Sequence, residues 1–170
     1  MTFEQLYLQH YQQIFKFCYR FVDDWEMAGD LSQDTFLKLY QRMKSGDKTI
    51  DNSRAWLYKV AGNTCLNELS KNKRRSEISS ELDFNSMETN NPETLLLEQE
   101  KKALLRKFIH QLKPEHRMLL LMYQDGLTYQ EMAEATGIPL NSIGKTLWRS
   151  IEKISNAIKQ KENVPGRTIS

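Results

Sequence analysis

Apolar residues recur three and four positions apart along most of the chain, which is the period of an amphipathic α-helix, and the two-residue alternation of β-strands is nearly absent. In the first half, this pattern predicts three helices, at about 3–22, about 25–44 and about 54–75. The first two are separated by a pair of aspartates, Asp23 and Asp24, and the last two by a polar loop. The expected inward face of the first helix consists of Phe3, Leu6, Tyr7, Tyr11, Ile14, Phe15, Cys18 and Phe21.

The second and third helices also gather their apolar residues on one side. The expected inward residues are Ala28, Leu31, Leu39 and Met43 in the second helix, and Trp56, Leu57, Val60, Ala61, Thr64 and Leu69 in the third. Three helices with one apolar face each can enclose a small core, so this part of the chain is predicted to form a helical domain.

Residues 76–93 lack a hydrophobic period, are rich in Ser, Glu, Asp and Asn, and close with Pro92. This composition is typical of a linker and marks the predicted domain boundary. Beyond it the pattern predicts a helix over about 93–111 and a short, very apolar helix through about 117–124. The predicted architecture is all-α with two small helical domains: residues 1–75, the acidic linker 76–93, residues 94–160, and a loose tail at 161–170.

The second domain contains the most specific local pattern in the chain. Thr128 and Glu131 stand at the two positions of a capping box, in which each side chain accepts from the other residue's backbone N–H. Leu127 and Met132 occupy the two positions of a hydrophobic staple. A helix is therefore expected to begin at Tyr129.

The turn after this helix is short, with Gly137 as a C-terminal cap and Pro139 in the first turn of the next helix. Two helices joined by such a turn form the helix-turn-helix motif, whose second helix lies in the major groove of DNA. The expected buried face of that helix is Ile143, Leu147, Ile151 and Ile154, and the opposite face is Asn141, Gly144, Lys145, Trp148 and Arg149. A helical hairpin inside a bundle would show a similar pattern, so both interpretations stay open at this point.

Composition and charge narrow the class of protein. The 170 residues have a formal net charge of +2 and a mean hydropathy of −0.64, and no stretch approaches the ~20 apolar residues of a membrane helix. Residues 1–75 carry 12 basic and 9 acidic side chains, 76–100 carry no basic and 7 acidic ones, and 101–170 carry 12 and 6. Two basic blocks around an acidic segment fit a polyanionic partner at each end. The first residues lack a secretion signal, so a cytoplasmic protein is expected.

Residues suited to catalysis or metal binding do not gather at any recognisable spacing. Cys18 and Cys65 sit inside helix-like apolar patterns, and His10, His110 and His116 are scattered. Buried thiols and surface imidazoles are expected, with a redox or zinc role as the alternative. We therefore expect no metal, no cofactor and no enzymatic activity.

Three blocks of the sequence resemble the extracytoplasmic-function (ECF) sigma factors, the two-domain members of the sigma-70 family. The first block is DLSQDTFLKLY at 30–40, and the second is RAWLYKVAGNT at 54–64, followed by a basic cluster. The third runs from Leu112 through the helix-turn-helix. Each block is moderately specific, whereas their order and spacing around an acidic linker are highly specific. The resemblance covers about residues 5–160 and implies a promoter-specificity subunit of RNA polymerase.

In that family, the second helix of the first domain binds the clamp helices of the largest polymerase subunit. The resemblance assigns this role to Asp30, Leu31, Gln33, Asp34 and Phe36. The spacing agrees, since residues three or four apart share one helix face, and this holds for Asp30, Gln33, Asp34 and Leu37. A solvated acidic stripe is the alternative interpretation.

The family uses the third helix and the loop before it to open the duplex at the −10 promoter element. The resemblance assigns this role to Asn63, Asn67, Lys71, Lys73, Arg74 and Arg75. The two asparagines are one turn apart and can both donate to and accept from a base edge, while the basic side chains would meet phosphates. Trp56 could stack on a base or anchor the core, and Asn63 could serve as a structural cap.

The second helix of the helix-turn-helix reads the −35 element in the family. The residues expected to do so here are Asn141, Ser142, Lys145, Trp148 and Arg149. The family's usual basic residue falls on Gly144, which also costs about 1 kcal/mol of helix propensity, and its usual arginine falls on Thr146. Base contacts are therefore not expected to copy the family average. Lys145 could approach guanine or a phosphate, and Trp148 could press on a thymine methyl group or pack on a neighbouring helix.

The resemblance implies several partners. They are the RNA polymerase core, through its clamp helices and β-flap, promoter DNA in duplex and melted form, and an anti-sigma factor that could hold the protein at the inner face of the membrane. The acidic linker would thread toward the RNA exit path, and no small-molecule substrate is expected. The residues alone leave two other functions open, an operator-binding regulator and a helical adaptor.

Overall fold

The computed structural model describes residues 1–46, 50–78 and 93–163. In these ranges it contains the helices α1 (Phe3–Val22), α2 (Trp25–Lys44), α3 (Ser53–Ile78), α4 (Glu93–Gln111), α5 (Pro114–Gln124), α6 (Tyr129–Thr136) and α7 (Leu140–Glu162). The all-α prediction is confirmed. The linker predicted at 76–93 begins as helix, because α3 continues to Ile78, and its last residue, Glu93, begins α4; residues 79–92 lie outside the described residues. The predicted tail is still helical at its start, and from 164 onward it too lies outside them.

Short polar side chains define the first helix boundaries. The Thr2 hydroxyl accepts from the backbone N–H of Gln5, whose side chain accepts in return from the Thr2 N–H, which completes a capping box at α1. Asp23 ends α1 in the left-handed conformation, with φ at 56°. The Asp24 carboxylate then accepts from the Met27 N–H at 2.9 Å and begins α2. The predicted break at this aspartate pair is confirmed.

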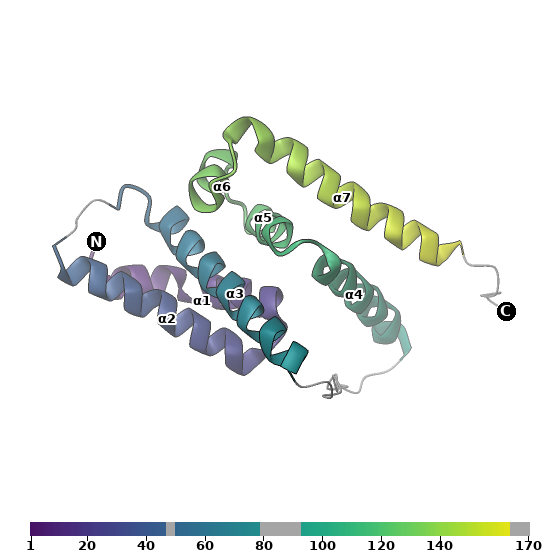
Figure 1. The fold of residues 1–170 in the computed structure, drawn as a ribbon, viewed down its shortest axis with the longest axis horizontal. Helices are drawn as coiled ribbons and strands as arrows, with labels where there is room; N and C mark the ends of the chain where they lie inside the picture. The colour runs from purple at the N-terminus through teal and green to yellow at the C-terminus, as the bar shows by residue number, and fades with distance from the viewer. Residues whose placement is uncertain (47–49, 79–92, 164–170) are drawn as a thin grey trace.

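The three helices α1, α2 and α3 pack together as the first half of the molecule (Figure 1). The inward face of α1 differs from the expected one, because its buried residues are Leu6, His10, Ile14, Phe17, Cys18 and Phe21. Phe3, Tyr7, Tyr11 and Phe15 are only half-buried. Tyr7, Tyr11 and Phe15 each follow a buried residue and so lie about 100° from it around the helix, at the edge of the buried face.

The second half packs α4, α6 and α7 around the short helix α5 (Figure 1). Five consecutive residues of α5, from Met118 to Met122, are each 5% exposed or less. A helix that is apolar on all sides must be covered on all sides, and α5 achieves this by also contacting α1 and α3. The run of apolar residues in the sequence therefore marks the centre of the molecule.

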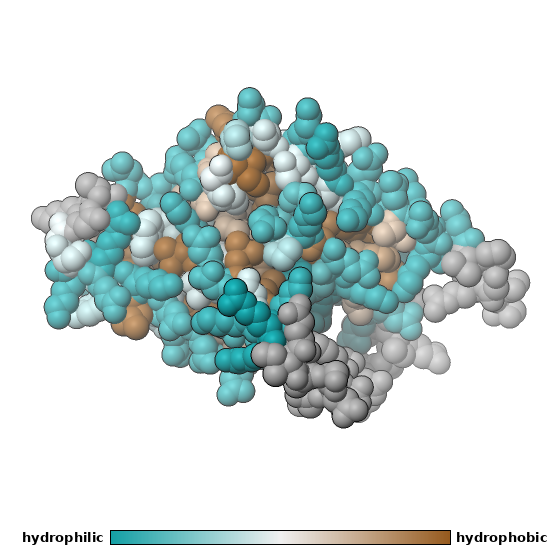
Figure 2. All heavy atoms as spheres, viewed as in Figure 1, coloured by the Kyte–Doolittle hydropathy of each residue, from teal (hydrophilic) through white to brown (hydrophobic). Residues whose placement is uncertain are grey.

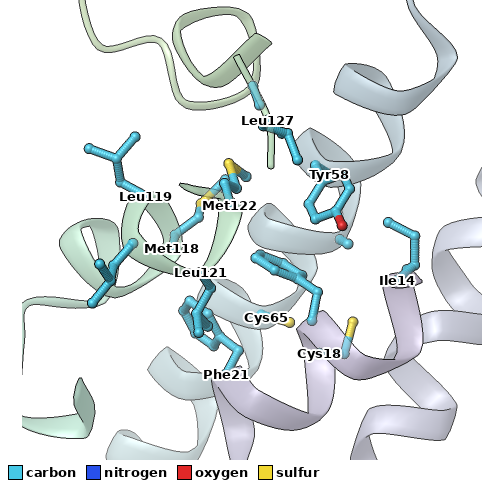
Figure 3. Close-up of a cluster of buried hydrophobic side chains, with 14 of the residues drawn as sticks. Ile14, Cys18, Phe21, Tyr58, Cys65, Met118, Leu119, Leu121, Met122 and Leu127 are labelled. Atoms are coloured by element: carbon cyan, nitrogen blue, oxygen red, sulfur yellow. The ribbon is translucent and has the colours of Figure 1, made fainter. Parts of the chain in front are cut away.

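The two halves share one continuous core. Figure 3 shows Ile14, Cys18 and Phe21 of α1 and Tyr58 of α3 beside the apolar side chains of α5 and Leu127. The closest approach is at Gly62 of α3, where an added Cβ would lie 2.2 Å from the Met118 Cε atom. The surface on the side of Figure 2 is mostly hydrophilic, with hydrophobic residues in small separate patches. The predicted domains are thus packed against each other rather than held apart.

Candidate nucleic-acid interface

The helix-turn-helix forms as the local signals indicate. The Thr128 hydroxyl accepts from the Glu131 backbone N–H at 3.1 Å, and the Glu131 carboxylate accepts from the Thr128 N–H at 2.9 Å, so the capping box is confirmed. The staple residues Leu127 and Met132 are both buried. Gly137 ends α6 with φ at 75°, the left-handed conformation that favours glycine.

The buried face of α7 is shifted from the expected one. It consists of Ile143, Leu147, Ser150 and Ile154, and the prediction is wrong for Ile151, which is 45% exposed. Ile151 lies eight residues after Ile143, which places it about 80° away around the helix. Pro139 stands at the N-cap, one position before the expected first turn.

The residues expected to read the −35 element lie on the opposite side of α7. Asn141, Lys145, Trp148 and Arg149 are exposed, and Ser142 is half-buried, with its hydroxyl 3.4 Å from the Asn141 side-chain oxygen. Trp148 is 61% exposed, so the alternative in which it packs on a neighbouring helix is excluded. This surface combines two cations, an amide and an aromatic ring.

Gly144, which departs from the family pattern, is packed against an aromatic side chain. A Cβ atom at this position would lie 3.3 Å from Cε2 and 3.7 Å from the hydroxyl oxygen of Tyr129, in ordinary or slightly tight contact. Tyr129 is the first residue of α6 and is 46% exposed. The ring thus occupies the flank of α7 where the family pattern would place a basic side chain. Sequence reasoning missed Tyr129, and its only signal was a glycine inside a predicted helix.

The residues expected to act at the −10 element lie on α3, from its middle to near its C-terminal end. All six are exposed: Asn63, Asn67, Lys71, Lys73, Arg74 and Arg75. Asn63 lies in the middle of α3, so it caps neither end of that helix. Trp56 is half-buried against the core, with the Arg42 guanidinium carbon 5.4 Å from its ring centroid. The structure therefore favours an anchoring role for Trp56.

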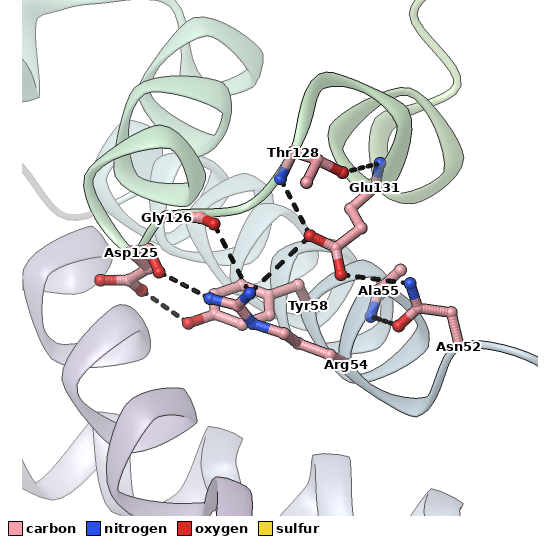
Figure 4. Close-up of polar contacts among 8 residues, drawn as sticks. All are labelled: Asn52, Arg54, Ala55, Tyr58, Asp125, Gly126, Thr128 and Glu131. Carbon is pink, nitrogen blue, oxygen red and sulfur yellow. Dashed lines mark hydrogen bonds and ion pairs between the residues drawn. The ribbon is translucent and has the colours of Figure 1, made fainter.

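The start of α3 is covered by α6 of the other half (Figure 4). The Asn52 side-chain oxygen accepts from the Ala55 N–H at 3.0 Å, and its amide nitrogen donates to the Glu131 carboxylate at 3.1 Å. Arg54 is 3.8 Å from the same carboxylate. Burial alone would raise the pKa of Glu131, but hydrogen bonds from Thr128 and Asn52 and the charge of Arg54 outweigh it and lower the pKa.

A second polar cluster surrounds Asp125, at the end of α5 (Figure 4). Its carboxylate accepts from the Tyr58 hydroxyl at 2.7 Å and from the Arg20 guanidinium. The Asp125 backbone carbonyl accepts from Arg54 at 2.6 Å. Tyr58 is 1% exposed, and burial together with the Asp125 charge raises the pKa of its phenol. Side chains of α1 and α3 thus hold the α5–α6 turn.

Arg117 makes the most deeply buried polar link between the halves. It is 6% exposed and donates to the backbone carbonyl oxygens of Phe21 at 3.0 Å and His110 at 2.6 Å. Its guanidinium carbon also lies 5.2 Å from the Phe21 ring centroid. Burial lowers the pKa of Arg117, and burial and the Arg117 charge lower that of His110. The contact of Arg117 with Phe21 was not predicted, because it joins residues 96 positions apart.

The residues of α2 that were predicted to bind polymerase are partly exposed and partly buried. Asp30, Gln33 and Asp34 are exposed, as a docking surface requires. Leu31 and Phe36, which the resemblance assigns to the same role, are 4% and 2% exposed and belong to the core beneath that surface. Their side chains point into the first-half core and support the surface from beneath. Gln33 and Asp34 border a surface cavity of about 390 Å³, which is also lined by Phe3, Tyr7, Phe36, Leu37 and Tyr40.

Among the described residues, no group of three or more His, Cys, Asp or Glu side chains could hold a metal ion. No helix in these ranges is both long and apolar enough to cross a membrane. Cys18 and Cys65 are free thiols with 0% exposure.

Two matches to known families coincide with the two halves of the structure. Residues 6–75 match Sigma-70 region 2, and residues 102–154 match Sigma-70, region 4. The RNA polymerase sigma factor YlaC of Bacillus subtilis is 32% identical over 167 residues, which cover 95% of each chain. This chain belongs to the sigma-70 family.

Further relatives place this sigma factor among the ECF type. The ECF RNA polymerase sigma-E factor of Escherichia coli K12 is 29% identical over 171 residues, covering 93% of this chain and 87% of the relative. The fold matches that of the sigma factor RpoE from Bartonella quintana, solved in complex with the anti-sigma factor NepR, with a TM-score of 0.72, 21% identity and coverage of 92% and 96%. The chain is thus an ECF sigma factor that directs transcription initiation at promoters, in a family of generally non-catalytic, regulatory proteins.

Proposed function

We propose that this sigma factor binds core RNA polymerase through the exposed acidic face of α2, melts the −10 element with α3 and reads the −35 element with α7. The observation that carries the proposal is the joint exposure of three surfaces on one chain. They are the carboxylates of Asp30 and Asp34, the basic end of α3 and the polar face of α7. An operator-binding regulator would need neither the exposed carboxylates on α2 nor the basic end of α3.

From its middle onward, α3 has the chemistry to hold a melted strand. Asn63 and Asn67 can each donate and accept a hydrogen bond with an unstacked base, and the cations beyond them can follow the phosphate backbone. Opening base pairs costs a few kcal/mol, which these contacts must return. Along α3, the amide side chains proposed to contact bases therefore come first, and the cations proposed to contact phosphates follow them.

The α7 surface has the chemistry to read a duplex. Lys145 and Arg149 are exposed on the side opposite the buried face, where a recognition helix meets base edges and phosphates. Trp148 adds an apolar contact, and Tyr129 borders the same surface from α6. With a tyrosine beside Gly144 in place of a basic side chain, the preferred −35 sequence is expected to differ from that of relatives that carry the usual pattern.

The packed arrangement has a consequence for the order of events. Glu131 is hydrogen-bonded to Asn52, and Glu134 lines a cavity of about 200 Å³ with Trp56 and Lys59. Carboxylates at this place repel phosphates, so strand capture at the start of α3 requires α6 to move away. An anti-sigma factor that binds the packed form would hold the protein inactive, and we include such a partner in the proposal.

Core polymerase supplies the chemistry in this scheme, and the sigma factor supplies DNA recognition. Its place of action is then the cytoplasm, where polymerase and chromosome meet. Run-off transcription with purified core and a library of genomic promoters tests the proposal. Core-dependent initiation at a subset of promoters is expected. Tight duplex binding without core and no initiation would instead indicate an operator-binding regulator, and no affinity for DNA or core would indicate an adaptor.

A charge substitution tests the DNA track on α3. Replacing Arg74 and Arg75 by alanine should weaken promoter complexes and reduce the slope of log affinity against log salt by about one unit per lost phosphate contact. The matched control replaces Lys101 and Lys102, an adjacent exposed pair on α4, and should leave binding to promoter DNA by holoenzyme unchanged. Equal slopes for both variants would remove the arginines from the DNA track.

A further inference from the structure

An exposed apolar strip runs along one flank of α7. Leu140, Trp148 and Ile151 are 49%, 61% and 45% exposed, and Gly144 stands between the first two in the sequence. At about 100° per residue, these four positions fall within about 80° around the helix. Exposed apolar residues that gather on one side of a helix indicate a binding surface, whereas scattered ones carry no such meaning.

Tyr129 borders this strip from the neighbouring helix. α6 packs against α7 (Figure 1), and an added Cβ atom at Gly144 would lie 3.3 Å from Cε2 and 3.7 Å from the hydroxyl oxygen of Tyr129. The tyrosine is 46% exposed, so it contacts α7 and also faces solvent. Because position 144 lacks a side chain, the ring of Tyr129 supplies the surface there. Tyr129, Gly144 and Trp148 together are called the Gly144 surface below.

The cations of α7 lie beside the Gly144 surface rather than on it. Lys145 and Arg149 are exposed and follow Gly144 by one and five residues, which places them about 100° and about 140° from it around the helix. These cations attract a polyanion, and the N-terminal part of the second helix in this motif faces base edges in the major groove. The apolar surface therefore meets a base pair when α7 docks on a duplex.

The chemistry of the Gly144 surface favours one base. Thymine presents a 5-methyl group in the major groove, whereas guanine presents two acceptors that require a donor. We propose that the Gly144 surface selects thymine at one position of the −35 element by holding its methyl group against the rings of Tyr129 and Trp148. This inference rests on the proposed function, which assigns α7 to the −35 element, and extends it by naming the base and the group that is recognised. Tyr129 is then a specificity-determining residue that α6 contributes.

Promoter DNA bound by holoenzyme tests the inference. In a promoter chosen from the run-off library, deoxyuridine replaces each thymidine of the −35 element in turn. This exchange removes the methyl group and leaves the hydrogen-bonding groups of the base in place. At one position, the affinity of holoenzyme for the promoter should fall about fourfold, which is the effect of one buried methyl group.

Substitutions of Tyr129 show whether its ring makes this contact. Tyr129→Ala removes the ring and should reduce the loss at this position to less than about twofold, whereas Tyr129→Phe keeps the ring and should retain the loss. The matched control is Tyr123→Ala on α5, where a tyrosine is 47% exposed, and it should also retain the loss. Urea unfolding of each variant checks that the fold is kept.

Gly144→Arg is the converse substitution. Its side chain would start 3.3 Å from the ring of Tyr129, and it should shift the preference at the same base pair from thymine to guanine. An effect at a different base pair, or a methyl-dependent loss that stays the same in Tyr129→Ala, would overturn the inference. Unchanged methyl dependence together with lost transcription in Tyr129→Ala would also overturn it, and would assign the strip to a protein partner. If scrambling the whole −35 element leaves binding unchanged, the proposed role of α7 itself fails.

Discussion

The two helices proposed to contact DNA differ in what covers them. The reading side of α7 is open, with Trp148 61% exposed and Lys145 and Arg149 beside it. The first turns of α3 are covered by α6, and the Asn52 side chain is engaged by Glu131. The packed structure is therefore ready to meet a duplex at α7, whereas the start of α3 becomes available only after contacts between the halves are lost.

The contacts that cover α3 differ in kind from the ones that build each half. Within a half, apolar faces pack along neighbouring helices, whereas between the halves charged side chains surround the apolar centre. Arg20 and Arg54 meet Asp125 and the turn after it, and Arg117 reaches across to α1. Charge-assisted hydrogen bonds are stronger than neutral ones but lose more when one partner is removed. Single substitutions should therefore separate the two kinds of contact.

The largest effect is expected from Arg117→Ala. The substitution leaves the carbonyl oxygens of Phe21 and His110 without their donor in a buried place, and it removes the packing of the guanidinium on Phe21. We expect a loss of about 3 kcal/mol in the free energy of unfolding, measured by urea denaturation.

Arg106→Ala is the matched control for this substitution. Arg106 also joins the halves, through Asp23 at 3.6 Å, but both side chains of that pair are about half exposed, at 52% and 44%. Its loss should cost less than about 1 kcal/mol. Equal costs for Arg106 and Arg117 would show that burial does not set the strength of the links between the halves.

Asp125→Ala should have the next largest effect. The Tyr58 hydroxyl would lose its acceptor while its ring stays buried, and Arg20 would lose its ion pair. A cost of about 2 kcal/mol is expected in urea unfolding. In a double-mutant cycle, Tyr58→Phe should recover part of it, because the variant then has no unpaired hydroxyl. Costs that simply add would show that Tyr58 and Asp125 act independently.

The sequence was sufficient for several features that depend on neighbours within one or two turns. The capping box at Thr128, the left-handed cap at Gly137 and the break at Asp23 were all predicted and are present. In each case the signal and the structure lie within a few residues of each other, so no other part of the chain can override them.

Features that depend on contacts between distant segments were not predictable in this way. The resemblance assigned Leu31 and Phe36 to a docking surface, yet both side chains are buried in the core that α2 forms with its neighbouring helices. Tyr58 was not expected inside, and it is buried between Phe17 of α1, whose ring centroid is 5.1 Å away, and Asp125 of the other half, which accepts its hydroxyl hydrogen bond. The site residues on α3 and α7 came from the resemblance, and their roles in binding stay predictions.

Two glycines give the smallest and most direct test of the comparison between α3 and α7. Gly62 and Gly144 both lie inside helices, where alanine is favoured by about 1 kcal/mol. At Gly62 the new methyl group would lie 2.2 Å from Met118 Cε and 2.7 Å from its sulfur, in a closed core, and overpacking there costs about 1–3 kcal/mol. At Gly144 it would lie 3.3 Å from the ring of Tyr129, which is 46% exposed and free to shift by the small distance required.

Gly62→Ala should therefore destabilise the protein by about 1 kcal/mol in net terms, and Gly144→Ala should stabilise it by about 0.5 kcal/mol in urea unfolding. Met118→Leu, which removes the Cε atom at nearly constant volume, should relieve the first effect and not alter the second. Two changes of the same sign would show that α3 is no more tightly covered than α7, and the proposed difference between the two helices would then be lost.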